Sequence, residues 1–175
     1  MQARPKAIAP PNASCASLRE GYARAGMGVR EMIEAPSRLA QQLGYAGVLP
    51  FALLACGCWL PAPFGLASQH ALLDYAAVIL GFLGAVHWGL ALHDPKPAPE
   101  RLVGGVLPSL VGWLALSLPP LAAFTVLATG FAAWLLWERR LGKEGRLSPW
   151  YLRLRGNLTL AVLMSLGIGA AAVSG

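Results

Sequence analysis

A histidine inside an apolar segment is the first residue of this sequence that could do chemistry. His87 lies in the stretch GAVHWG, residues 84–89, within a long run of apolar residues. A neutral imidazole donates one hydrogen bond and accepts another, and it can also bind a metal or relay a proton. Ionisable residues in apolar membrane segments are functional candidates by default. His87 is therefore either a packing residue with partners inside the protein or a member of a binding site.

The sequence offers few partners for His87. Ser109, in the next apolar segment, is expected at a comparable depth, so its hydroxyl could satisfy one hydrogen bond of the imidazole. Haem in a membrane bundle normally takes two axial ligands, and His70 and His93 lie at other depths or on other faces. A structural hydrogen bond is the favoured interpretation, and contact with a lipid- or quinone-like molecule is the alternative.

The composition indicates that the solvent of this chain is lipid. Of its 175 residues 56% are hydrophobic and 13% are charged, whereas a soluble domain carries about 25% charged residues. The odd number of cysteines, Cys15, Cys56 and Cys58, argues against a disulfide framework. Cys56 and Cys58 lack the second ligand pair of a zinc site, so we expect no metal.

Apolar runs predict five membrane-spanning helices, at about 45–60, 71–92, 102–118, 121–137 and 158–173. Residues 102–137 carry no charge. As one helix they would measure about 54 Å against a hydrocarbon core of about 30 Å, so Pro119 and Pro120 are expected to form a tight turn. Pro50 and Pro108 fall inside spans and are expected to weaken or kink them. The predicted fold is an all-α membrane bundle over residues 37–175.

Residues 1–36 are predicted to be a disordered, basic tail, since they contain four prolines and no long apolar run. Met27 and Met32 are alternative starts to Met1.

The basic residues predict the orientation of the bundle. With the N-terminus inside, segments 1–44, 93–101 and 138–157 hold all 14 Lys and Arg residues. The positive-inside rule therefore predicts an N-in, C-out topology. The lipid bilayer is the expected partner, and the basic charge does not indicate nucleic-acid binding. The Ala/Gly/Leu/Arg-rich composition favours a multi-pass protein of a bacterial inner membrane, or of the mitochondrial inner membrane if the chain is eukaryotic.

Two groups of residues are candidate sites. A stripe of small residues, Ala77, Gly81, Ala85 and Gly89, recurs every four residues and predicts a helix-packing seam. A polar and aromatic group is expected around His87 near the inner interface: Tyr45, His87, Trp88, Ser109, Trp113, Glu138, Arg155 and Asn157. Trp137, Trp150, Tyr151 and Arg153 are expected at the same level. Glu138 is predicted to pair with Arg153 or Arg155. Such a group is either an interfacial belt or a pocket for a lipid or isoprenoid head.

Several pieces of sequence resemble a known family. They are LGYAGVLPF, DYAAVILGFLGAVHWGLAL, LPSLVGW and WYLRLRGNLT, in that order, and FLGAVHWG is the most specific. This order resembles the domain-of-unknown-function 3429 family, which includes the animal transmembrane protein 69. Glu138 stands where the family pattern often has Asp. The resemblance implies a multi-span inner-membrane protein without an assigned activity and supplies no catalytic residues.

The sequence contains no hydrolase, nucleotide or metal motif, so we predict no catalytic residues and no cofactor, and a membrane enzyme is the third choice. The leading hypothesis is an accessory or assembly factor that packs against partner helices through its small-residue stripe. The alternative is a binding or transport protein for a lipid- or quinone-like molecule, with a cytoplasmic-side pocket near His87.

Overall fold

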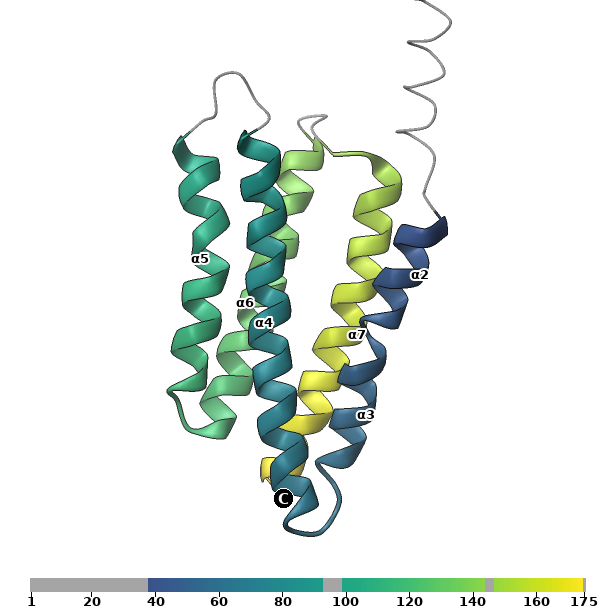
Figure 1. Ribbon diagram of the computed structural model, residues 1–175, viewed down its shortest axis with the longest axis vertical. Helices are drawn as coiled ribbons and strands as arrows, with labels where there is room; N and C mark the ends of the chain where they lie inside the picture. The colour runs from purple at the N-terminus through teal and green to yellow at the C-terminus, as the bar shows by residue number, and fades with distance from the viewer. Residues whose placement is uncertain (1–37, 93–98, 144–146, 175) are drawn as a thin grey trace, which may run out of the picture. The chain divides into compact units, whose positions relative to one another are not determined.

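The computed structural model describes residues 38–92, 99–143 and 147–174, and all regular structure in these ranges is helical (Figure 1). The all-α fold class is therefore confirmed for these segments of the chain. The helices are α2 (Arg38–Ala46), α3 (Leu49–Gly57), α4 (Phe64–Leu92), α5 (Pro99–Leu116), α6 (Pro120–Lys143) and α7 (Pro149–Ser174). The predicted tail at residues 1–36 lies outside the described residues.

Four helical segments are long and apolar enough to cross a membrane: Arg38–Gly57, Phe64–Gly89, Pro120–Lys143 and Pro149–Ser174. Within α5, Leu102–Ala115 is a shorter apolar stretch. Each of the five apolar runs expected from the sequence therefore forms helix. The last helix is much longer than expected, since α7 begins at Pro149 rather than near residue 158.

Prolines determine where two of the helices begin. Pro50 has no N–H, and its ring would collide with the carbonyl group of Ala46 in a continuous helix. The chain accordingly breaks at residues 47–48, between α2 and α3, and the Tyr75 hydroxyl donates a 3.0 Å hydrogen bond to the Gly47 carbonyl at this break. Pro120 starts α6 directly after the short turn that follows α5, as expected. Pro108, in contrast, stays inside α5.

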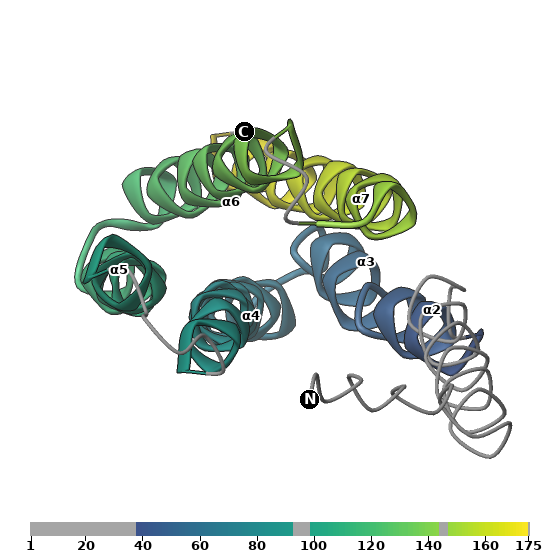
Figure 2. The same ribbon diagram turned by 90° about the horizontal axis from the view of Figure 1, so that it is seen from above.

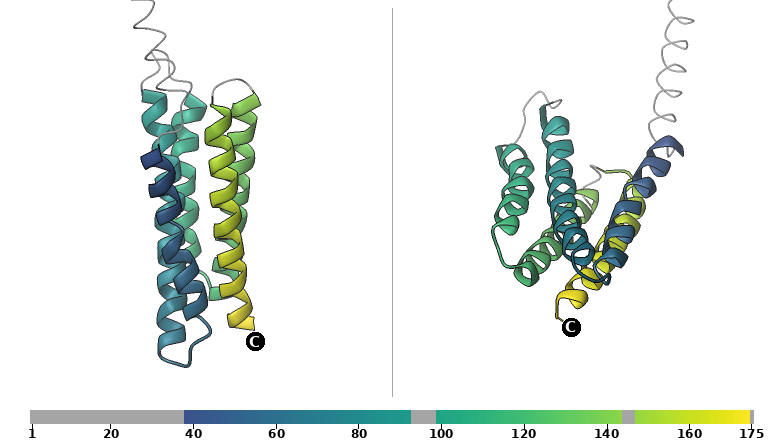
Figure 3. Two further views of the ribbon diagram at one scale, coloured as in Figure 1. Left: turned by 90° about the vertical axis from the view of Figure 1, so that its right-hand side faces the viewer. Right: turned by 60° about the horizontal axis from the view of Figure 1, so that its bottom comes forward.

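The helices form two layers. Seen along the helix axes, α5, α4 and the α2–α3 pair lie in one row, and α6 and α7 lie across from them (Figure 2). A side view separates the same two rows, with α7 facing α3 (Figure 3). Apolar side chains fill the space between the rows: Phe51, Leu72, Leu80, Phe124, Leu127, Phe131 and Leu166 are almost completely buried.

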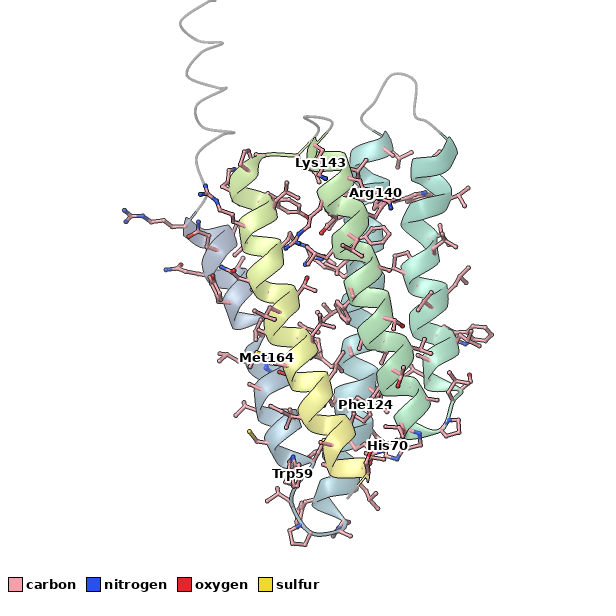
Figure 4. The ribbon with its side chains drawn as sticks, turned by 180° about the vertical axis from the view of Figure 1, so that it is seen from behind. Trp59, His70, Phe124, Arg140, Lys143 and Met164 are labelled. Carbon is pink, nitrogen blue, oxygen red and sulfur yellow. The ribbon has the colours of Figure 1, made fainter. Side chains whose placement is uncertain are left out.

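The two ends of the bundle differ in charge. Arg140 and Lys143 lie at one end, whereas Trp59 and His70 lie at the other (Figure 4). We call the first the basic end, because Arg38, Arg139, Arg140, Lys143 and Arg153 occur in the helix segments there. The described segments of the opposite end, 58–70, 117–121 and 170–174, contain no Lys or Arg.

Candidate functional site

Four side chains from three helices form a buried polar cluster. His87 of α4 makes a 2.9 Å hydrogen bond from its Nε2 to Glu138 Oε1 of α6. From α7, the Tyr151 hydroxyl donates to the same oxygen over 3.1 Å, and Arg155 Nε donates to Glu138 Oε2 over 3.0 Å. We refer to His87, Glu138, Tyr151 and Arg155 as the polar cluster. Glu138 is its centre, because every hydrogen bond in the cluster ends on its carboxylate.

The cluster lies deep in the protein. The relative exposures of His87, Glu138 and Arg155 are 6%, 0% and 8%. Each residue lies about 8 Å along its helix from the basic end, taking about 1.5 Å per residue. Charged side chains at such burial are costly unless they are paired and hydrogen-bonded, and this carboxylate accepts bonds on both oxygens. An ionised carboxylate only accepts hydrogen bonds, so the His87 imidazole carries a proton on Nε2.

Helical spacing places these residues on facing sides of their helices. On α6, Phe131, Trp134 and Glu138 follow one another at intervals of three and four residues. On α7, Tyr151, Arg155 and Thr159 recur every four residues. Residues at these intervals share one helix face. The polar face of α7 therefore meets that of α6 at Glu138, which also binds His87 of α4.

Two tryptophans of α6 flank the imidazole. The ring centroids of Trp134 and Trp137 lie 5.3 Å and 5.0 Å from that of His87, both in edge-to-face geometry. The indoles also contact each other, with a centroid separation of 4.6 Å. These ring contacts restrict the orientation of the His87 imidazole.

A cavity of about 160 Å³ adjoins the cluster. Its walls come from α2, the break at residues 47–48, α3, α4, α6 and α7, and they are mostly apolar. Its polar lining side chains are Arg155 and Thr159, which we call the donor pair. Arg155 Nη2 and Thr159 Oγ1 are buried and have no hydrogen-bond partner within the described structure. We refer to this space as the Arg155 cavity.

A second hollow, of about 420 Å³, lies between α5 and α6. Trp134 and Trp137 line it, together with apolar residues such as Leu107 and Val111. Trp134 Nε1 is buried without a partner among the described residues. The two tryptophans thus separate this hollow from His87.

No group of three His, Cys, Asp or Glu side chains in the described residues could hold a metal ion. Of the cysteines there, Cys56 is exposed and Cys58 packs partly against the core. Burial raises the pKa of the Cys58 thiol, so this side chain stays protonated and packs as an apolar group.

The structure brings together three of the eight candidate residues around His87. Glu138 binds both His87 and Arg155, and the ion pair expected for Glu138 is with Arg155 rather than with the exposed Arg153. Ser109 is not the partner of His87; its Oγ lies 3.1 Å from the place that a Cβ on Gly81 would take. The other four, Tyr45, Trp88, Trp113 and Asn157, are exposed on different helices and outside the cluster.

The small-residue stripe is divided between the α4–α5 contact and the surface. Ala77 and Gly81 face Gly112 and Ser109 of α5, but Ala85 and Gly89 are exposed. The contact continues instead through Gly84, where an added Cβ would collide with the carbonyl oxygen of Gly105. The seam within the chain therefore runs along Ala77, Gly81 and Gly84.

Thr159 and Trp134 were not among the predicted residues, whereas Tyr151 and Trp137 were expected at the inner interface. The four-residue spacing from Tyr151 through Arg155 to Thr159 was the available signal for Thr159. Trp134 precedes Glu138 by four residues, which places both on one face of α6.

Comparisons with known proteins agree with this membrane-helical character. Transmembrane protein 69 of Xenopus tropicalis is 30% identical over 150 residues, covering 79% of this chain and 55% of the relative. The chain thus spans about half the length of that relative. No solved structure matches the chain. A family model described as protein of unknown function (DUF3429) matches residues 36–171, which include the whole polar cluster. The chain therefore belongs to the DUF3429 family.

Proposed function

We propose that this protein binds a small membrane-soluble molecule that carries a carbonyl oxygen, such as a quinone or a related lipid, in the Arg155 cavity. The observation that carries the proposal is the donor pair. Arg155 and Thr159 both line the cavity, and each has a buried donor without a partner in the described structure, Nη2 and Oγ1, that can donate to an oxygen of a ligand.

The energetics favour an occupant with a hydrogen-bond acceptor. A buried donor without a partner costs about 1–3 kcal/mol, and more when the group is charged. A ligand oxygen between Arg155 and Thr159 would remove this penalty for both groups. Nothing about the donor pair requires a reaction, so we propose binding or transport rather than catalysis.

The size and lining of the cavity favour a ring. An apolar cavity of about 150 Å³ in another protein accommodates benzene, so about 160 Å³ takes one six-membered ring. Phe51, Phe131 and Val162 supply buried apolar walls. Leu43 and Phe82 line the cavity and are themselves exposed, so an attached aliphatic chain can leave between them toward lipid.

In this proposal the polar cluster positions Arg155 for the ligand. Arg155 donates a hydrogen bond from its Nε to the Glu138 carboxylate, which leaves its Nη2 available to bind a ligand. His87 and Tyr151 hold Glu138 in place from the other side. The ligand is thus proposed to contact Arg155 rather than His87. His87 would affect binding only by holding Glu138, which in turn positions Arg155.

Thr159→Val tests this function, because it keeps the shape of the side chain and removes the hydroxyl. The protein is purified in mild detergent, and bound quinones and lipids are quantified by mass spectrometry per mole of protein. We expect bound ring compound to fall about tenfold, in line with the loss of one hydrogen bond of about 1.4 kcal/mol. The ligand-free protein should not lose stability, since an unpaired hydroxyl is removed.

Ser165→Ala is the matched control. Ser165 is also a buried hydroxyl of α7, but it donates to the Ala161 carbonyl within its own helix and does not line the cavity. The control should retain the ligand. Equal ligand content in wild type, Thr159→Val and Ser165→Ala, or no ring compound in any of them, would exclude the proposed function.

We also propose that α5 is a fifth crossing and that the protein lies in an inner membrane with its N-terminus inside. The clustering of basic residues at one end supports this orientation, because such residues remain on the cytoplasmic or matrix side. Alkaline phosphatase fused after Ser174 should be active in a bacterial host, and green fluorescent protein fused there should stay dark. A bright C-terminal fluorescent fusion would reverse the topology.

The second candidate function is that of an accessory protein that packs against a helix of a partner. Only the exposed half of the small-residue stripe supports it. Ala85 and Gly89 are open, and a Cβ on Gly89 would meet nothing within 4 Å. Photo-crosslinkers placed at Ala85 should capture a second helix if this surface serves an accessory function. Crosslinks to lipid alone would leave the accessory role without support.

A further inference from the structure

The outer surface of α6 and α7 carries an open groove, separate from the Arg155 cavity, with a volume of about 720 Å³. The polar side chains of the groove lie near the basic end, where Leu152 also lines it, and the remaining leucines lie deeper along the helices. The polar residues are Arg139, Lys143, Arg153 and Asn157, and Leu135 and Leu160 are among the apolar ones. We refer to this feature as the α6–α7 groove.

Sequence spacing creates the two sides of the groove. Leu135, Arg139 and Lys143 recur every four residues along α6. Arg153, Asn157 and Leu160 follow one another at four and three residues along α7. Each set occupies one helix face. Because both helices run along the bundle axis, both faces change from charged to apolar in the same direction, away from the basic end.

The cations of the groove have no acidic partner in the described structure. Glu138, which precedes Arg139 in the sequence, uses both oxygens for the polar cluster, and Glu144, which follows Lys143, lies outside the described residues. Arg139 reaches across to α7, since its Nη2 lies 3.5 Å from the position of a Cβ on Gly156. The guanidinium thus lies over the groove beside a residue without a side chain. Three exposed cations that line one groove repel one another and favour an anionic occupant.

We infer that the α6–α7 groove binds an anionic phospholipid. Its phosphate would lie among Arg139, Lys143 and Arg153, with Asn157 as an additional hydrogen-bond donor. One acyl chain would follow Leu135 and Leu160 toward the membrane centre. Basic pockets between membrane helices on the inner side are a recurring environment for such headgroups. The order of charge and leucine along the helix axis matches the order of headgroup and chain in a lipid.

The charge-neutral triple variant R139Q/K143Q/R153Q tests the inference. The full-length protein is studied by native mass spectrometry in micelles that contain phosphatidylglycerol or, separately, phosphatidylcholine. Each cation near an anionic headgroup contributes about fivefold to affinity, so the triple variant should bind phosphatidylglycerol about a hundredfold more weakly. Binding of phosphatidylcholine should be weak in the wild type and unchanged in the variant.

Arg140→Gln is the matched control. Arg140 is the neighbour of Arg139 and is also exposed, but it does not line the groove. It should retain wild-type affinity for phosphatidylglycerol. A similar loss per charge in Arg140→Gln would show general attraction to the basic end and overturn the inference, as would unchanged affinity in the triple variant.

The stability of both variants distinguishes a lost site from a misfolded protein. The substituted side chains are exposed, so melting temperatures in detergent without phospholipid should match that of wild type. Phosphatidylglycerol should then raise the melting temperature of wild type and Arg140→Gln but not that of the triple variant. Equal shifts in all three proteins would overturn the inference. Thr159→Val should show the wild-type shift, since the Arg155 cavity is a different site.

Discussion

Helix α4 contacts its neighbours on two sides within a single turn, and the two contacts differ in chemistry. Gly84 faces α5, where the backbones of Gly84 and Gly105 approach so closely that no Cβ fits on Gly84. His87 faces α6 and joins the fully buried carboxylate of Glu138. The first contact depends on the absence of side chains. The second depends on an ionised group that three other side chains must satisfy.

The two contacts differ in how they stabilise the bundle. Apolar burial does not drive helices together in a membrane, so close backbone packing of small residues is an efficient way to hold α4 to α5. A buried ion network is a poor source of stability, because desolvation offsets much of the attraction. In the proposed function, the polar cluster supports Arg155 beside the cavity.

Glu138→Gln should produce the largest effect on stability. The amide has the same shape as the carboxylate, but it leaves Arg155 as a buried, uncompensated charge. Removal of one partner from a buried ion pair costs about 3–5 kcal/mol. The free energy of unfolding, measured by denaturant titration or steric trapping in micelles, should fall by this amount.

A second substitution distinguishes the effect of the buried charge on stability from the effect of packing. Arg155→Met in the Glu138→Gln background removes the uncompensated charge and should recover most of the lost stability, as apolar replacements of buried ion pairs often do. Arg140→Gln, at an exposed position of the same helix as Glu138, should change stability by less than about 0.5 kcal/mol. An equal loss in the single and double variants would show that the cluster stabilises by shape rather than by charge.

Gly84→Ala should produce the next largest effect, because one methyl group must push α4 and α5 apart. Overpacking of this kind costs about 1–3 kcal/mol. Gly89→Ala is the matched control on the same helix, since its methyl group would meet nothing within 4 Å. Helix propensity alone predicts a gain of up to about 1 kcal/mol for the control. Equal losses at the two positions would exclude close α4–α5 packing as the cause.

The seam shows what sequence periodicity can and cannot predict. The small residues of the stripe indicate that α4 approaches another helix closely, and at Ala77 and Gly81 it does. A four-residue repeat, however, advances by about 40° per step on a helix of 3.6 residues per turn. From Ala77 to Gly89 the stripe therefore rotates by about 120°, out of the α5 contact. The contact with α5 continues through Gly84, which lies on nearly the same side of the helix as Ala77. The sequence does not show where α5 lies, so it does not predict this.

The sequence predicts the polar cluster incompletely for a different reason, which is the placement of a helix end. A fourth span that stops at residue 137 puts Glu138 at the membrane interface and leaves Ser109 as the expected partner of His87. In the structure α6 continues to Lys143, and Glu138 lies more than one turn inside the helix. Charged residues after an apolar run mark a change of solvent, and the helix itself can continue through them.

Tyr151→Phe should have a smaller effect on stability than Glu138→Gln or Gly84→Ala. It removes one 3.1 Å hydrogen bond to Glu138 and keeps the ring. Such a bond contributes about 0.5–1.5 kcal/mol, and two other donors still satisfy the carboxylate. Introduced into the Glu138→Gln background, the same substitution should cost clearly less, since its charged acceptor is already gone. Tyr45→Phe, on an exposed ring outside the cluster, should have no measurable effect in either background. A Tyr151→Phe loss that is identical in both backgrounds would mean that the hydroxyl does not act through Glu138, and the cluster would reduce to His87, Glu138 and Arg155.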